Sequence, residues 1–256
     1  MEKRCIRLGG VILGAGRCAV CIPAMGESIA TLRESAHAAK EAGADLIELR
    51  ADSLCAMPGV QYACDMCAAV RDAASGVPLL FTLRTERDGG AGDADCARYE
   101  ALLCALAARE ERPVDALDVE LSAGEEVFAR IASAAAKARV VVVGSSHDFD
   151  RTPPESEMCM RLAAMQRLGA DVCKIAVMPH SRLDVLALMR AAAVSDEALS
   201  APVIAIAMGP LGVMTRVCGE AFGSCLTFGT AGQASAPGQI DARQLHTALE
   251  IIHHSL

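Results

Sequence analysis

The sequence predicts an α/β fold, a single (β/α)8 TIM barrel whose lower end is closed by an N-terminal β-hairpin. Three observations lead to this prediction. Strand-like and helix-like segments alternate along the whole chain. The strand-like segments are almost continuously apolar, which is typical of parallel strands that are covered on both faces. The length of 256 residues matches one such barrel, and no linker, repeat or low-complexity segment divides residues 1–256, so we expect one domain.

The hairpin is the first predicted element. Arg4–Leu8 and Val11–Leu13 flank Gly9-Gly10, and a glycine pair between two apolar runs is typical of a tight β-turn. In a barrel, this hairpin is expected to close the end at which the strands begin.

Eight strand and helix units follow. The helix that starts after Ser28 has a serine cap and stops at Gly43, and another helix begins after Pro153-Pro154. The predicted strands are Ala19–Ala24, Asp45–Ala51, Pro78–Leu83, Val114–Val119, Arg139–Ser145, Asp171–Val177, Pro202–Ala207 and Cys225–Phe228. The other predicted helices are Val60–Ala74, Asp95–Arg109, Gly124–Lys137, Ser181–Ala193, a short one near Gly212–Gly219, and Asp241–His253.

An open, doubly wound sheet is the alternative arrangement. Such a sheet would be favoured by a glycine fingerprint between the first strand and a helix. The glycines within Leu8–Gly16 are not followed by a helix pattern, so the closed barrel is the better interpretation.

Composition limits the classes of partner. The net charge of −8, together with five phenylalanines, two tyrosines and no tryptophan, argues against a nucleic-acid surface. Met1–Leu8 has no apolar signal core, and the longest uncharged stretch is too rich in Gly, Ser and Gln to span a membrane. We therefore expect a cytoplasmic protein that acts on a small molecule, and a local arginine cluster would still suit an anionic one.

Twelve cysteines raise the question of a metal or disulfide site. Cys18 and Cys21 lie three apart in a predicted strand, so their side chains point to opposite faces. Cys64 and Cys67 can share one face of a predicted helix, but no second pair or nearby histidine completes a zinc set. We expect reduced cysteines that pack as small apolar residues, and no metal site.

A lysine inside a buried strand is the most informative feature of the chain. Lys174 interrupts the apolar strand Asp171–Val177, and an ammonium there is costly because desolvation disfavours its charged form. A desolvated lysine is a route to a Schiff base with a carbonyl substrate. His147, at the end of the preceding strand, would supply the acid and base that this chemistry needs.

Other polar residues gather where the predicted strands end, which is where barrels build their active sites. Each also has a structural interpretation: Glu48 and Arg50 as an interior ion pair, Arg84 as a structural salt bridge, and Gly229–Gln239 as a plain connection. Their joint placement favours a site. The set comprises Glu48, Arg50, Arg84, Asp118, Glu120, His147, Lys174, Arg216, Ser235 and Gln239.

Taken together, these segments resemble type I 3-dehydroquinate dehydratase, a Schiff-base-forming enzyme of the shikimate pathway. The resemblance runs in order from the first barrel strand to Gln239. It rests on Glu48-Leu-Arg-Ala-Asp52, Phe81-Thr-Leu-Arg-Thr85, Ser145-Ser-His-Asp-Phe149, Cys173-Lys-Ile-Ala-Val-Met-Pro179, Ala207–Arg216, Glu220–Ser224 and Ser235-Ala-Pro-Gly-Gln239.

The resemblance implies a reaction and a homodimer. Lys174 would form an iminium with the C3 ketone of 3-dehydroquinate, and His147 would move protons during syn loss of water to 3-dehydroshikimate. No metal or organic cofactor is needed, because the iminium is the electron sink. A biosynthetic role towards chorismate and a catabolic role are both compatible with it.

The resemblance also assigns the other site residues. Glu48, Arg50 and Arg84 would contact ring hydroxyls, and Met208 and Phe228 would be apolar walls. At the carboxylate end, Arg216, Ser235 and Gln239 would bind the substrate, the last two when the segment from Gly229 to Gln239 closes.

One position departs from the family pattern. The family usually has Glu-Gly-Gly where this chain has Asp88-Gly-Gly, and that carboxylate orients the catalytic histidine. We expect Asp88 to keep this role, with a backbone shift or a bridging water to make up for the missing methylene. Glu86 is a less suitable substitute because it lies two positions away.

Two other functions remain open. A class I aldolase of the transaldolase type would share the lysine chemistry, but it would need a phosphate loop that the sequence does not show. A non-catalytic metabolite-binding barrel would keep the arginines without needing both Lys174 and His147.

Overall fold

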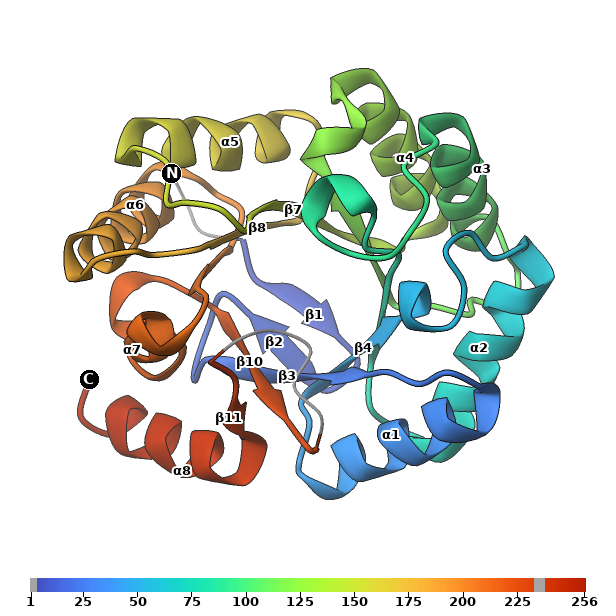
Figure 1. Ribbon diagram of the computed structural model, residues 1–256, viewed down its shortest axis with the longest axis horizontal. Coiled ribbons are helices and arrows are strands. Elements are labelled where there is room, and N and C mark those ends of the chain that lie inside the picture. The colour runs from blue at the N-terminus through green and yellow to red at the C-terminus, as the bar shows by residue number, and fades with distance from the viewer. Residues whose placement is uncertain (1–3, 233–237) are drawn as a thin grey trace.

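The computed structural model describes residues 4–232 and 238–256, and it shows parallel strands arranged in a ring with helices outside (Figure 1). The ring closes between the last two of its strands in chain order, where the amide of Cys225, just before the last strand, donates to the carbonyl oxygen of Val203 at 2.9 Å. The strands, in chain order, are β3 (Ala19–Ala24), β4 (Leu46–Arg50), β5 (Leu79–Thr82), β6 (Ala116–Glu120), β7 (Val141–Asp148), β8 (Val172–Val177), β9 (Val203–Ala207) and β10 (Leu226–Thr230). The predicted TIM barrel is confirmed.

The helices cover the outer face of the barrel. They are α1 (Ile29–Glu41), α2 (Val60–Ala73), α3 (Cys96–Ala107), α4 (Glu125–Ala138), α5 (Glu155–Arg167), α6 (Arg182–Ala198), α7 (Val213–Val217) and α8 (Ala242–His253). The predicted cap is present, since the Ser28 hydroxyl accepts from the Thr31 amide. Helix α6 runs five residues past the predicted end at Ala193, because Ser195 continues its buried face.

Short 3₁₀ turns follow several strands and shape the loops above them. They are η1 (Ala51–Ser53), η2 (Glu86–Asp88), η3 (Leu121–Ala123), η4 (Pro210–Gly212) and η5 (Gly219–Phe222). A two-residue strand, β11 (Ile240–Asp241), pairs with β10 after the last loop.

Three strands end later than the sequence predicted, and one of them, β10, ends at Thr230 instead of Phe228. The other two are neighbours in the barrel. Strand β7 continues to Asp148 instead of Ser145, because its last residues still pair with the end of β8. Strand β6 ends at Glu120 instead of Val119. Both extensions carry polar side chains to the end of the barrel at which the strands finish.

The hairpin closes the opposite end of the barrel, as predicted. Strands β1 (Ile6–Leu8) and β2 (Val11–Leu13) are antiparallel and lie across the ring in Figure 1. Leu8 and Leu13 are buried among side chains that point into the barrel from the starts of the strands. At Gly14, an added Cβ would lie 2.8 Å from the Pro202 ring, so the hairpin also packs closely on the start of β9.

The cysteines differ in burial: Cys5 is exposed, four are buried and the others are partly buried. All twelve are free thiols, and Cys18 and Cys21 face the outer core and the barrel interior respectively. Among the described residues, no group of three or more His, Cys, Asp and Glu side chains is arranged to hold a metal ion. Within the same part of the chain, no helix combines the length and the apolar character that crossing a bilayer requires.

The hairpin contact predicts a large stability difference between neighbouring positions. Leu13→Ala should lower the free energy of unfolding by about 2–5 kcal/mol, because Leu13 is fully buried and its removal leaves a cavity. Ile12→Ala in the same strand is the control and should cost about 0.5 kcal/mol or less, because Ile12 is 36% exposed. Urea unfolding followed by circular dichroism measures both. Equal losses would contradict the role given to the hairpin.

Candidate active site

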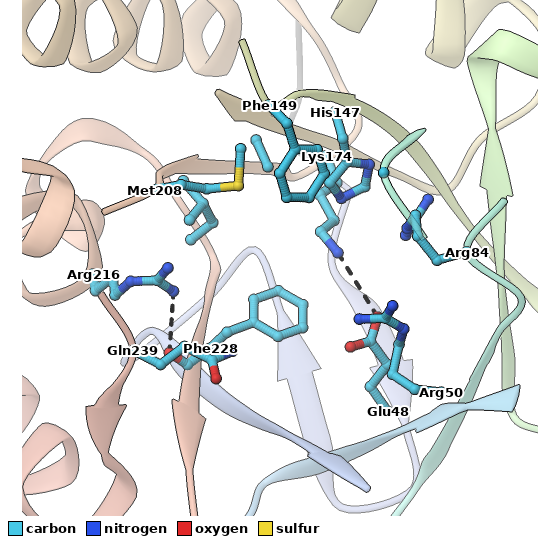
Figure 2. A pocket seen from close by; sticks show the side chains of 13 residues that line it. Glu48, Arg50, Arg84, His147, Phe149, Lys174, Met208, Arg216, Phe228 and Gln239 are labelled. Carbon is cyan, nitrogen blue, oxygen red and sulfur yellow. Dashed lines mark hydrogen bonds and ion pairs between the residues drawn. The ribbon is translucent and has the colours of Figure 1, made fainter. Parts of the chain in front are cut away.

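A pocket lies at the end of the barrel where the strands finish, and Figure 2 shows its side chains converging on one cavity. It brings together most of the residues that the sequence singled out, from seven different strands and loops. The lining residues are Glu48, Arg50, Arg84, Gly89, His147, Phe149, Lys174, Ala176, Ile206, Met208, Arg216, Phe228 and Gln239. Asp88 lies behind His147, and Ser235 lies outside the described residues.

Strand alternation explains why Lys174 enters this pocket. Its neighbours Cys173 and Ile175 pack in the outer core against the helices, so Lys174 points inward. Only 5% of the residue is exposed. A lysine at any odd position of the same strand would have faced the helices instead.

Two carboxylates and an aromatic ring surround the Lys174 ammonium. Nζ lies 3.9 Å from Glu48 Oε1 and 3.8 Å from Asp118 Oδ2, and 4.3 Å from the centroid of the Phe228 ring. The sequence predicts a buried amine with Glu48 and Asp118 nearby, and both carboxylates lie at these short distances. Their charges favour a positive charge on the amine, and the ring supplies a further favourable contact.

His147 is held by one carboxylate through two hydrogen bonds. Its backbone amide donates to Asp88 Oδ2 at 3.0 Å, and Nδ1 of the ring lies 3.0 Å from the same oxygen. Because a carboxylate can only accept, we place the ring proton on Nδ1, which leaves Nε2 as the basic nitrogen. Burial, assisted by the positive charge of Arg84, lowers the pKa of His147 from 6.5 to about 3. The imidazole is therefore neutral at pH 7.

Asp88 reaches His147 directly, so the expected backbone shift or bridging water is unnecessary. Burial opposes ionisation of Asp88, but the hydrogen bond and charge of His147 outweigh it and lower the pKa of this carboxyl. Glu86 points to solvent and does not take the role.

The loop that carries Asp88 packs closely on the backbone at the end of β5. The turn η2 ends at Asp88 and is followed by Gly89 at φ +76°. At Gly90 an added Cβ would lie 2.1 Å from the carbonyl oxygen of Arg84, so only glycine allows the loop to lie this close to the end of β5.

Arg84 is the centre of a buried ion network. Its guanidinium lies 2.9 Å from Asp118 Oδ2, 2.8 Å from Glu120 Oε1 and 3.9 Å from Asp88 Oδ2. Against the cost of burial, the charges of Arg84 and Lys174 lower the pKa of Asp118 to about 2. Arg84 faces the pocket, but its charge is largely balanced by these carboxylates, so it would offer a ligand mainly directed hydrogen bonds.

Arg50 is fixed in a comparable way by a single partner. Asp52 receives two hydrogen bonds from its guanidinium, at 2.9 Å from Nε and 2.7 Å from Nη2. This bidentate geometry orients Arg50 at the rim of the pocket, beside Glu48 (Figure 2). Glu48 itself accepts from the Thr82 hydroxyl at 2.9 Å.

The other side of the pocket carries Arg216. Its Nη1 donates to the carbonyl oxygen of Phe228 at 3.3 Å, and burial lowers its pKa to about 10, which leaves it charged at pH 7. Gln239 lies beside Arg216, and Met208 lies across the cavity from Phe228 (Figure 2). This half of the pocket pairs a buried cation with apolar walls, an environment that suits an organic anion.

Sequence reasoning did not assign roles to four lining residues, one of which, Gly89, directly follows Asp88. Ala176 and Ile206 fill the wall beside Lys174, and only a structure could show which apolar strand residues do so. Phe149 also lines the pocket although it is 38% exposed. A signal for it existed, because an aromatic residue two positions after His147 lies on the same side of an extended strand.

Comparisons with known proteins agree with this geometry. A family model described as Type I 3-dehydroquinase matches residues 20–256. The chain belongs to this family. Proteins named 3-dehydroquinate dehydratase from Bacillus licheniformis and Syntrophotalea carbinolica are 38% and 40% identical to it, covering 99% and 97% of this chain and 100% and 98% of theirs. The crystal structure of type I 3-dehydroquinate dehydratase from Clostridium difficile, with covalently modified comenic acid, has a TM-score of 0.94 and 36% identity and covers 100% of both chains.

More distant barrels share only the architecture. A 3-hexulose-6-phosphate synthase structure has a TM-score of 0.58 with 16% identity, which shows the fold and no more.

The ion network predicts a strong effect on stability. Arg84→Met should destabilise the fold by about 3–5 kcal/mol at pH 8, because it leaves buried carboxylates without their cation. Burial raises the pKa of Asp118 and of Glu120, and the charge of Arg84 is the first cause that opposes this rise in both. Without Arg84 these carboxyls take up protons at a higher pH than in the parent, which removes their uncompensated charge, so the deficit should shrink at pH 5.

The control for this prediction is an exposed arginine. Arg130 forms an ion pair with Glu100 on the surface, so Arg130→Met should cost about 1 kcal/mol or less at either pH. Chemical unfolding at pH 5 and pH 8 provides the measurement. A deficit for Arg84→Met that is small, or that grows as the pH falls, would count against the network.

Proposed function

We propose that this protein is a 3-dehydroquinate dehydratase that removes water from 3-dehydroquinate through a Schiff base on Lys174, with His147 as general acid and base. The observation that carries the proposal is the meeting, in one pocket of a type I 3-dehydroquinase, of a buried lysine and a neutral histidine held by a carboxylate. The relatives named 3-dehydroquinate dehydratase support the activity.

The first stage forms the Schiff base. The ammonium of Lys174 loses one proton, and the free amine adds to the C3 carbonyl. Water leaves from the resulting carbinolamine and the positively charged iminium remains. Glu48 and Asp118, which lie within 4 Å of Nζ, stabilise that positive charge as they stabilise the ammonium.

The second stage eliminates water. The iminium accepts the electron pair of the C2–H bond while His147 takes the proton, which gives an enamine. The electron pair then returns to form the C1–C2 double bond, and the C1 hydroxyl leaves as water with the proton from His147. Hydrolysis of the conjugated iminium releases 3-dehydroshikimate and restores Lys174. One molecule of water is lost overall, and no electron acceptor is consumed.

The low pKa of His147 keeps its imidazole in the basic form, and binding of the substrate would raise this pKa. At about 3 in the empty pocket, the imidazole is fully in the basic form. A base works best when its pKa is close to the working pH. A bound substrate carboxylate adds negative charge to the pocket, which favours the imidazolium and raises the pKa of His147 towards that range.

The substrate is oriented from both sides of the cavity. On one side Arg216 and Gln239 would hold its carboxylate, joined by Ser235, whose position lies outside the described residues. On the other side Glu48, Arg50 and Arg84 would bind the ring hydroxyls. These contacts, together with the single domain, the cytoplasmic location and the homodimer, remain part of the proposal.

Trapping with borohydride tests the covalent step. Incubation with 3-dehydroquinate followed by reduction should add the mass of the reduced ring to the peptide that contains Lys174, while absorbance of the conjugated product appears without the reductant. Lys174→Met should remove both signals. Lys137→Met replaces an exposed lysine on α4 and should keep both.

Each rival function gives a different outcome in that assay. An adduct only with a ketose phosphate would indicate an aldolase. Binding of dehydroquinate without adduct or product would indicate a metabolite-binding barrel. Parental turnover by the Lys174→Met protein would overturn the mechanism itself.

A second variant tests the role of Asp88. Asp88→Asn should lower kcat by about 100-fold or more with little change in KM, because Asp88 lies behind His147 and fixes its tautomer. Any acid limb of the pH profile should not move to higher pH, since Asp88 raises the pKa of His147 and its loss lowers it. Asp148→Asn changes the carboxylate next to His147 in sequence and should stay within about threefold of the parent. A similar rate for Asp88→Asn would contradict the assignment.

A further inference from the structure

An aromatic ring lies close to the proposed base, and the steps above do not use it. Phe149 follows the end of β7, and its ring centroid is 6.3 Å from that of His147 with 20° between the two planes. This is an offset, nearly parallel arrangement. Figure 2 shows both rings entering the pocket from the same strand. Phe149 is 38% exposed, so the ring separates the imidazole from solvent.

The same ring packs on the loop that carries the partner of His147. At Gly89, an added Cβ would lie 2.4 Å from Cδ2 and 2.5 Å from Cε2 of Phe149. The ring therefore rests directly on the backbone of Gly89, the residue after Asp88. Phe149 thus packs on the turn that carries Asp88 and stacks on the ring of His147.

We propose that Phe149 is a positioning residue for His147, whose ring keeps water from the imidazole and holds the Asp88-Gly89 backbone against it. This inference rests on the proposed dehydratase function, because it assigns a task to Phe149 within that same site. It differs from a role as a passive wall, which would change substrate affinity and leave the histidine unaffected.

The charges around His147 determine what removal of the ring would do. Four groups act on the imidazole: Asp88 from η2, Arg84 from β5, Asp118 from β6 and Lys174 from β8. On the other face of β7, Arg161 of α5 donates to Ser146 and pairs with Glu157, so this ion pair faces away from the ring. Truncation of Phe149 changes none of these charges, because the side chain it removes is uncharged.

The expected direction follows from burial, which is the main cause of the low pKa of His147. Phe149→Ala admits water, so the pKa of His147 should rise from about 3 towards its ordinary 6.5. The basic form is lost as the pH falls through this raised value. The variant should therefore lose activity at a higher pH than the parent.

The experiment is a pH profile of kcat and kcat/KM for dehydroquinate between pH 5 and 8, within the range where circular dichroism shows both proteins folded. In kcat/KM, which reports the free enzyme, Phe149→Ala should be slower by about tenfold or more at pH 5.5 relative to its own value at pH 8, and the parent should change much less. Phe149→Leu keeps an apolar cover and should recover most of the parental profile. Nitrogen NMR of the histidines in the ligand-free protein should show a raised pKa for His147 in Phe149→Ala.

A matched control is available elsewhere in the chain. Phe222 in η5 is also 38% exposed and does not line the pocket, so Phe222→Ala should keep the parental pH profile. An unshifted acid limb in Phe149→Ala, with only KM raised, would overturn the inference, as would an unchanged His147 titration. If the parent does not dehydrate dehydroquinate, the proposed function fails, while the NMR titration still decides whether Phe149 shields the histidine.

Discussion

The chemistry of this pocket depends on the buried charge of Arg84. A guanidinium with 3% of its surface exposed is stable only because carboxylates on β6 and in the loop after β5 surround it. Two of those carboxylates also contact the proposed catalytic residues, Lys174 and His147. Asp118 faces Lys174 and Asp88 holds His147. Arg84 thus places its partners and, through its positive charge, helps to keep the imidazole neutral.

The network explains how one small cavity holds a cationic amine and an uncharged base. The carboxylates Glu48 and Asp118 favour a positive charge at Lys174, whether as ammonium or as iminium. Burial favours the neutral form of His147. Among the described residues, Asp88 is the one carboxylate paired with that ring. Groups whose environments favour different charge states are a general feature of sites that transfer protons.

The barrel brings these side chains together through the regular alternation of its strands. Parallel strands direct alternate side chains inward, so residues on adjacent strands meet at the end where the strands finish. The hairpin seals the opposite end with leucines, which leaves one end of the interior for polar groups. The loops that follow the strands place the remaining site residues. In the loop after β5, Gly90 packs against the backbone of Arg84 and Gly89 packs under the ring of Phe149.

The sequence by itself determined the barrel, the hairpin, the order of the elements and most of the residues that meet in the pocket. Local patterns suffice for these features, because apolar strands, helix caps and polar strand ends are properties of neighbouring residues. Tertiary structure decided the remainder. It extended β7 to Asp148, set the distances of Glu48 and Asp118 from Lys174, brought the shorter Asp88 into direct contact with the histidine, and laid Phe149 on Gly89. These outcomes depend on distances between residues far apart in the chain, and such distances are set by packing, which no local pattern encodes.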